Sequence, residues 1–519
     1  MENPEPQCPG SLNPGPGVCH NGGMTTETAG QPLDGCDDAR QSSPPGHGLA
    51  GLAIGAGLAM MAAAFLVWPE IPDGRSGSAA VYPPTERPNI VLIVIDALRA
   101  DRIGARRNDQ PVMPALESLS RAGTVYVNTW APSSWTRPSM ASLFTSLPIE
   151  AHQVRWSADP DRPDGPSDGL AEPFETLAEY LRQAGWHTAG VQTNPNCLPE
   201  FGLAQGFDVY AFSAEWRAEQ VTDKALELTG QMEWPFFLYA HYMEPHLPYP
   251  ASLEARAAMG WPPPGLSAAD LEAVDKGFLE YFWAYLRHRC GLSVTPPPDF
   301  SEARRDAVRL IYDAAARTVD TAVVRLVTRI MQQFPHTLFL IVADHGEQFW
   351  DHELLGHGLT LYDEETRIPW ILYGWNTPAG VREYAPASLL DVMPLLAGRL
   401  RLPRRDYWMG AIPGAPKRPV FSSTRAPWPS WNVQLDMVIF EGWKLIFDGR
   451  QDAFELYDLS ADPGERHNLA GTAVETVEQG KALWREHLEE AISRRRAGQE
   501  IRLLDESVQE QLRAIGYME

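Results

Sequence analysis

Three side chains with the chemistry of metal ligands follow apolar runs of the sequence. The run Asn89–Ile95 (NIVLIVI) ends in Asp96. The run Thr337–Ala343 (TLFLIVA) ends in Asp344 and His345. Both runs have the length and β-branched content of strands buried on both faces of a sheet, and open α/β sheets bind ligands beyond the carboxyl ends of such strands. The two carboxylates and the imidazole therefore predict a divalent cation site, without choosing among zinc, manganese, magnesium and calcium.

A candidate nucleophile lies in residues 133–147, SSWTRPSMASLFTSL. Pro138 is typical of a first helical turn, which places Thr136 at the start of a helix. Its hydroxyl could simply cap that helix. It could equally attack an ester, because a helix N-terminus favours anions and a nearby metal ion lowers the pKa of a hydroxyl. The residue pattern leaves both interpretations open.

The elements that must position these residues alternate between helix and strand. Helices are predicted at 113–122, 174–184 and 301–333, and further strands at 187–192 and 235–239. The alternation predicts a doubly wound α/β domain with a mostly parallel sheet, which we place at residues 88–400. An aromatic-rich helical insert lies between residues 262 and 298. We expect it to serve local packing rather than to form a substrate lid.

After residue 400 the pattern changes to short strands followed by a charged helix. The strands are predicted at 419–423, 433–440, 443–447 and 454–459. They predict a smaller α+β subdomain, residues 401–519, that is built on an antiparallel sheet.

The first 87 residues form three segments of different composition. Residues 1–47 are rich in Gly and Pro and lack a hydrophobic period, which predicts a disordered tail. Residues 48–68 are uncharged, apolar and long enough to span a hydrocarbon core of about 30 Å, so we interpret them as one transmembrane helix. A cleaved signal peptide fits less well, because a long tail precedes the run and no small-x-small cleavage site follows. Residues 69–87 are interpreted as a linker.

The overall composition excludes some classes of protein. The net charge of −24 argues against a nucleic-acid partner. The five cysteines contain no CxxC pair, and three of them lie in the first 47 residues, so neither a zinc ribbon nor a disulfide scaffold fits.

Five segments of the chain carry a family resemblance. They are PNIVLIVIDALRAD (88–101), SSWTRPSMASLFTSLPIEAH (133–152), PFFLYAHYMEPHLPY (235–249), VADHGEQFWDHELLGHGLTLYDEETRIPWIL (342–372) and ELYDLSADPGERHNLA (455–470). In this order they resemble the sulfatase-like branch of the alkaline phosphatase superfamily, over nearly all of residues 88–519. The resemblance implies an alkaline-phosphatase-like α/β/α sandwich with a C-terminal antiparallel subdomain.

The resemblance also implies roles for individual residues. Asp96, Asp344 and His345 would bind the metal ion, and Thr136 would be the nucleophile and a further ligand. The residues taken to bind the anionic substrate are Arg137, His246, His352 and His357, of which His246 and His357 would also be catalytic. A structural role is the alternative for His352. His241 and Glu244 could extend the site or hold a second metal ion.

Three departures from the family pattern bear on the substrate. True sulfatases of this family carry Cys or Ser in a C/S-x-P-x-R motif, which matures to formylglycine, whereas this chain has Thr136 and replaces the motif arginine by Met140. Ala97 replaces the second aspartate of the usual pair. Threonine cannot become formylglycine, and a threonyl ester lacks the second hydroxyl through which a hydrated aldehyde eliminates sulfate. Related lipoteichoic acid synthases, phosphoethanolamine transferases and nucleotide pyrophosphatases use threonine on phosphoesters.

These observations lead to one main hypothesis and two alternatives. The main hypothesis is a metal-dependent hydrolase or phosphotransferase that cleaves phosphoesters through a covalent Thr136 intermediate. The first alternative is a sulfuric ester hydrolase, and the second is a membrane-tethered binding protein without turnover. We expect a single-pass membrane protein with an extracytoplasmic catalytic domain, acting on an envelope or extracellular glycan or a lipid headgroup.

Overall fold

The two apolar runs that end in Asp96 and Asp344 form adjacent parallel strands, β1 (Asn89–Ile95) and β10 (Thr337–Ala343). Every residue of both strands is buried, as predicted. The register pairs Ile95 with Ala343, so the two aspartates leave the sheet side by side at its carboxyl edge. The structure is a computed structural model that describes residues 87–156, 166–414, 418–425, 427, 431, 433–449, 451, 453–496, 500–503 and 506–514.

β1 and β10 belong to an eight-stranded sheet that is mostly parallel. Only β13 runs against its neighbours, β10 and β4. In spatial order the strands are β14 (Val381–Glu383), β4 (Thr124–Tyr126), β13 (Trp370–Gly374), β10, β1, β9 (Phe236–Tyr242), β7 (His187–Gln192) and β8 (Val209–Phe212). The predicted strands at 187–192 and 235–239 correspond to β7 and β9.

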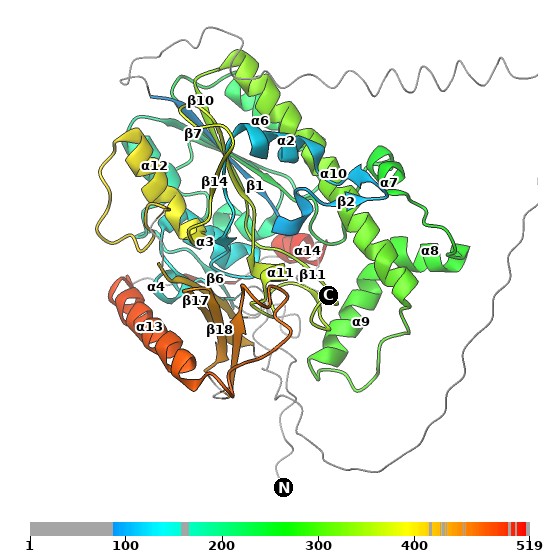
Figure 1. Ribbon diagram of the computed structural model, residues 1–519. Helices are drawn as coiled ribbons and strands as arrows, with labels where there is room; N and C mark the ends of the chain where they lie inside the picture. Colours follow the sequence, from blue (N-terminus) through cyan, green and yellow to red (C-terminus); the bar gives the residue numbers. More distant parts are fainter. Residues whose placement is uncertain are drawn as a thin grey trace, which may run out of the picture. The chain divides into compact units, whose positions relative to one another are not determined.

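Helices cover both faces of this sheet (Figure 1). One layer contains α2 (Pro114–Ala122), α6 (Ala218–Thr229) and α10 (Glu302–Gln333). The other contains α3 (Thr136–Thr145), α5 (Leu177–Gln183) and α12 (Val392–Leu400). Local sequence sets the helix starts: the hydroxyl of Thr176 accepts the N–H of Glu179 to cap α5, and Ser301 caps α10 in the same way. The predicted α/β/α sandwich is confirmed.

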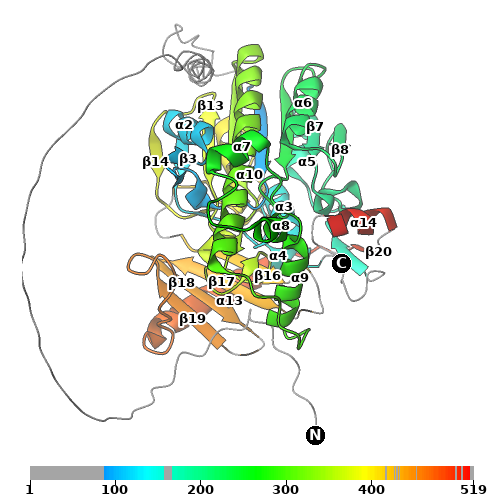
Figure 2. The ribbon, with the colours of Figure 1, turned by 90° about the vertical axis from the view of Figure 1, so that its right-hand side faces the viewer.

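The aromatic insert forms three helices, α7 (Leu253–Met259), α8 (Ala268–Asp275) and α9 (Phe278–Arg289), beside α10 (Figure 2). The aromatic side chains of α9 are buried in a cluster that includes Phe300 and Trp350. The rings of Tyr281 and Phe300 stack with centroids 4.1 Å apart. The insert therefore contributes to the core, which agrees with the expectation of local packing.

The C-terminal region contains a separate four-stranded antiparallel sheet, as predicted. Its strands are β16 (Val420–Arg425), β17 (Gln434–Phe440), β18 (Trp443–Asp448) and β19 (Ala453–Asp458), and α13 (Val474–Ser493) lies against it. Alternate residues of β17 serve two cores: Val438 and Phe440 pack with Trp484 of α13, whereas Met437 and Ile439 join a cluster with Trp130 and Trp135. The domain boundary near residue 400 stays a prediction.

The predicted membrane location is corrected. In the part of the chain that the structure describes, no helix combines the length and the apolar character needed to cross a lipid bilayer. The interpreted span itself, residues 48–68, lies outside the described residues, as do the tail and the linker up to residue 86.

Candidate active site

The centre of the site consists of three completely buried side chains at the carboxyl edge of the large sheet: Asp96, Asp344 and His345. Each offers one ligand atom within 4.8 Å of the other two. The Nε2 of His345 is 3.5 Å from Oδ1 of Asp96 and 3.6 Å from Oδ2 of Asp344. The structure thus brings together the three ligands predicted from the strand ends.

The donor atoms at this centre fit a divalent cation. Oδ1 of Asp96 and Oδ2 of Asp344 are buried and accept no hydrogen bond from any described residue. Nδ1–H of His345 donates to the carbonyl oxygen of Gly346 at 2.8 Å, a tautomer assigned from this contact, which leaves the Nε2 lone pair facing the carboxylates. Burial and the Asp96 carboxylate raise the pKa of Asp344. A cation held by the three side chains would satisfy both oxygens and offset this repulsion.

Thr136 lies beside these three candidate ligands. Helix α3 begins at Thr136, and the preceding Trp135 occupies the N-cap position with extended backbone angles. The predicted position of Thr136 at the helix start is confirmed. Because Trp135 is the N-cap residue, Thr136 is the first residue of the helix and not its cap. The Oγ1 of Thr136 is 3.3 Å from Nε2 of His345 and 3.2 Å from Nδ2 of Asn194.

Asn194 and His241 hold one oxygen of Asp96. The Nδ2 of Asn194 donates to Oδ2 of Asp96, and the Nε2 of His241 lies 2.9 Å from the same oxygen. Tyr239 orients His241, because its hydroxyl lies 2.6 Å from Nδ1. Both contacts on Oδ2 leave Oδ1 available for an ion. Sequence reasoning missed Asn194, although it follows the predicted strand 187–192 and the strand-end rule could have found it.

Glu244 does not join His241. Its Oε1 accepts the N–H of Ala218 at 3.1 Å, at the start of α6. Among the described residues, Asp96, Asp344 and His345 form the one group of three or more side chains that could hold a metal ion. The idea of a second metal site at His241 and Glu244 therefore has no geometric support.

His246 and His357 border the candidate metal site, next to His345. The ring of His357 has its centroid 4.3 Å from that of His345 and 4.8 Å from that of His246. Burial lowers the pKa of His246 to about 4, and burial together with His345 lowers that of His357 well below its usual value. Nδ1 of His357 is 3.1 Å from Oε1 of the buried Glu347. The structure brings both histidines to the site, and their contact with substrate stays a prediction.

Arg137 contacts a different set of residues. Its guanidinium carbon lies 3.5 Å from the centroid of the Phe201 ring. Its nitrogens donate to the carbonyl oxygens of Trp156 at 3.1 Å and Asp168 at 3.3 Å, and to Oδ1 of Asn196 at 2.9 Å. These contacts tie the start of α3 to neighbouring segments of the chain. The substrate-binding role of Arg137 stays a prediction.

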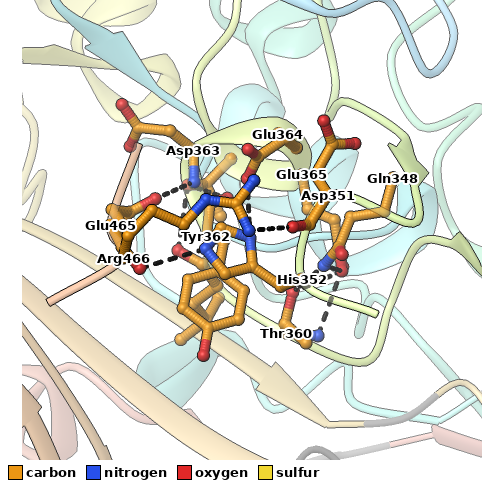
Figure 3. Close-up of polar contacts among 12 residues, drawn as sticks. Gln348, Asp351, His352, Thr360, Tyr362, Asp363, Glu364, Glu365, Glu465 and Arg466 are labelled. Atoms are coloured by element: carbon orange, nitrogen blue, oxygen red, sulfur yellow. Dashed lines mark hydrogen bonds and ion pairs between the residues drawn. The ribbon is translucent and has the colours of Figure 1, made fainter. Parts of the chain in front are cut away.

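His352 contacts Tyr362, Glu364 and, in the C-terminal subdomain, Glu465 (Figure 3). Its ring stacks on Tyr362 with centroids 3.7 Å apart, and its Nδ1 lies 3.3 Å from Oε2 of Glu364. The Nε2 lies 3.1 Å from the carbonyl oxygen of Glu465. Both ring nitrogens are therefore used by protein contacts, which favours the structural alternative over substrate binding.

The structure shows the surroundings of two departures from the family pattern, Ala97 and Met140. Ala97 adopts a left-handed backbone with φ of 54°, and its N–H donates to Oδ1 of Asp344 at 3.2 Å. Its backbone thus orients a ligand, but its methyl group supplies none. Met140 is completely buried in α3 and places an apolar side chain where the family motif has an arginine.

Comparisons with known proteins agree with this fold. The family model described as Sulfatase matches residues 88–401. The chain is 25% identical to the multifunctional alkaline phosphatase superfamily protein PehA of Trinickia caryophylli, over 78% of this chain and 95% of PehA. It is 22% identical to arylsulfatase K of Gallus gallus, over 78% and 83% of the two chains. The crystal structure of the phosphonate monoester hydrolase of Agrobacterium radiobacter superposes with a TM-score of 0.59 at 19% identity, covering 78% of this chain and 95% of that one.

Proposed function

The chain belongs to the sulfatase family of hydrolases, within the alkaline phosphatase superfamily, and from this premise we propose that it hydrolyses a phosphate or phosphonate ester through Thr136. One observation carries the proposal: the Thr136 hydroxyl lies at the start of α3 and 3.3 Å from a candidate metal ligand, His345. A hydroxyl in this position can attack an anionic ester.

In the first step the Oγ1 of Thr136 forms a bond to phosphorus, and the bond to the leaving oxygen breaks. The first-turn N–H groups of α3 favour the negative charge of the ester there. Asn194 orients the hydroxyl, because its amide donates to Oγ1. An ion bound by Asp96, Asp344 and His345 would supply Lewis-acid stabilisation of the ester oxygens and of the alkoxide.

In the second step water attacks the phosphorus of the group bound to Thr136, the bond between Oγ1 and phosphorus breaks, the phosphate or phosphonate leaves, and the hydroxyl is regenerated. His246 and His357 are the neutral imidazoles beside the centre, so they are the side chains placed to move the protons. In the first step the proton of the Thr136 hydroxyl passes to the leaving oxygen, and in the second step a proton of the water returns to Thr136. Exclusion of bulk water follows from the burial of all these groups.

A second candidate is sulfate ester hydrolysis, which the name of the relative arylsulfatase K favours. The side chain of Thr136 does not suit the formylglycine mechanism of sulfate ester hydrolysis. Its Cβ carries a methyl group, so oxidation of the side chain cannot produce an aldehyde. A sulfated threonine would also need displacement by water rather than elimination. The phosphonate monoester hydrolase that shares the fold supports the first candidate.

The two candidates are separated by assaying the full chain on phosphate monoester, phosphate diester, phosphonate monoester and sulfate ester substrates of one phenol. The assay is repeated with Mn²⁺, Zn²⁺, Mg²⁺ and Ca²⁺. We expect phosphorus esters to be cleaved at least tenfold faster than the sulfate ester. Rapid acid quench of a slow phosphorus ester should leave a phosphate or phosphonate mass increment on the peptide that contains Thr136.

Faster cleavage of the sulfate ester than of the phosphorus esters, without a modified peptide, would favour the sulfatase candidate. Metal binding without turnover of any ester would instead support the alternative of a binding protein. A site-directed loss of activity at Thr136 alone would not decide between the esters, because both candidates place that hydroxyl at the reacting centre.

A further inference from the structure

A short helix, α11 (Asp363–Thr366), supports the backbone next to the metal centre. The carbonyl oxygen of Glu365 accepts the N–H of Gly346 at 2.7 Å, and that of Glu364 accepts the N–H of Glu347 at 2.8 Å. A Cβ at position 346 would lie 2.0 Å from the Glu364 oxygen, so this close approach requires glycine. The segment that follows His345 is therefore fixed to α11.

The Glu365 carboxylate fixes a second segment. Its Oε2 accepts the backbone N–H groups of Gly358 at 2.9 Å and of Leu359 and Thr360 at 3.3 Å. Its Oε1 accepts a hydrogen bond from Gln348 at 2.7 Å, and Figure 3 shows Glu365 with Gln348 and Thr360. Gly358, Leu359 and Thr360 directly follow His357 in sequence. A single helical turn thus holds the loops of two site histidines.

A buried cation from the C-terminal sheet fixes α11 in turn. Lys444 of β18 is completely buried, and its Nζ lies 2.9 Å from Oδ1 of Asp363 and 2.7 Å from Oε1 of Glu465. The other oxygen of Glu465 accepts the N–H of Asp363 at 2.7 Å. Burial alone would lower the pKa of Lys444, but the two carboxylates raise it above its usual value. The ammonium group therefore stays charged between them.

We propose that Lys444 is a positioning residue of the active site, which acts through α11 to hold His345 and His357 in place. The C-terminal sheet then completes the site without touching the substrate. Removing the ammonium group leaves two buried carboxylates facing each other, and their repulsion displaces the first residue of α11. The backbone bonds to residues 346–347 and 358–360 loosen as a result. This inference rests on the proposed function for its catalytic consequence, but its structural consequence is independent of it.

The test compares Lys444→Met with wild type and with Lys481→Met, a matched control that removes an ammonium group paired with Glu478 on α13. Hydrogen exchange of the peptide covering 345–361 is measured at 20 °C, together with Mn²⁺ affinity by calorimetry. In Lys444→Met we expect at least tenfold faster exchange in this peptide and at least tenfold weaker Mn²⁺ binding. With an ester that wild type cleaves, kcat should fall more than tenfold, while KM changes less than threefold.

A purely structural role would lower the melting temperature of Lys444→Met but leave exchange, Mn²⁺ affinity and kcat at wild-type values, and that result would overturn the proposal. If Lys444→Met does not fold, Lys444→Gln decides by the same readouts, since it keeps a donor but not the charge. Failure of both variants to fold would show that Lys444 acts on the whole fold, which also overturns it. Hydrogen exchange needs neither metal nor substrate, so it remains decisive if wild type binds no Mn²⁺ or cleaves no ester.

Discussion

The Nδ2 of Asn194 lies 3.2 Å from the Oγ1 of Thr136 and donates a second hydrogen bond to Asp96. One amide thus links the proposed nucleophile to a candidate metal ligand. Because the amide nitrogen of Asn194 can only donate, the hydroxyl hydrogen of Thr136 points away from Asn194.

We predict that Asn194→Ala lowers kcat about 10- to 100-fold, the loss expected when a hydrogen bond worth about 1.5–3 kcal/mol to a charged group is removed. Steady-state kinetics on a phosphorus ester would measure it. The control is Asn128→Ala, which removes an amide that donates to the carbonyl oxygen of Tyr384. Unchanged kcat in Asn194→Ala would contradict an orienting role.

Asp344→Asn should abolish high-affinity metal binding and activity while the fold survives. In wild type, saturating metal at about 100 times Kd adds about 2.7 kcal/mol to the free energy of unfolding, and the variant should lose that increment. Without metal the variant should be at least as stable as wild type, because it removes a buried carboxylate whose pKa is raised.

Metal analysis and thermal melts with and without Mn²⁺ check the Asp344 prediction. Asp223→Asn is the matched control, since it removes an exposed carboxylate that pairs with Arg325. An unchanged metal stoichiometry in Asp344→Asn would remove this residue from the ligand set.

Thr136→Ser keeps a hydroxyl at the start of α3 and should retain much of the activity. Thr136→Ala deletes the covalent route and should lose at least about a thousandfold in kcat. Metal binding should survive in both variants if Thr136 is a nucleophile rather than an essential ligand. Kinetics and metal analysis on the same preparations would check this, and an active Thr136→Ala would exclude covalent catalysis by this residue.

The candidate ligands could be predicted from sequence because each follows a continuous apolar strand. Two such strands in one parallel sheet deliver their carboxyl ends to the same edge, as Asp96 and Asp344 show. Thr136 could be placed at a helix start from Pro138 alone. These are local rules, and tertiary structure did not override them.

The contacts of Arg137 and Lys444 could not be predicted in this way. Arg137 is adjacent in sequence to Thr136, the proposed nucleophile. A helix turns successive side chains by about 100°, so Arg137 faces other residues, among them Asn196. The partners of Lys444, Asp363 and Glu465, come from distant segments that only the folded chain brings together. Contacts of this kind depend on how the C-terminal sheet packs, which no local pattern specifies.

His152, a buried histidine that contacts Ser142 of α3, predicts how the free energy of unfolding depends on pH. His152 ends the short helix α4 (Ile149–His152), and its Nδ1 accepts the N–H of Val154 at 3.1 Å. Its Nε2 lies 2.9 Å from the hydroxyl oxygen of Ser142. Burial, with a smaller effect of Arg155, lowers the pKa of His152 from 6.5 to about 3. The folded protein therefore keeps this imidazole neutral.

Between pH 6.5 and pH 3 the unfolded chain binds a proton at His152 that the folded protein does not, so stability must fall as the pH falls through this range. From pH 7 to pH 5 we expect His152 alone to cost roughly 2 kcal/mol. His152→Asn retains an acceptor for Val154 but cannot take up the proton. Urea unfolding at several pH values should therefore show a flatter dependence in this variant, by about that amount between pH 7 and pH 5. Equal slopes for wild type and His152→Asn would mean that another group carries the acid sensitivity.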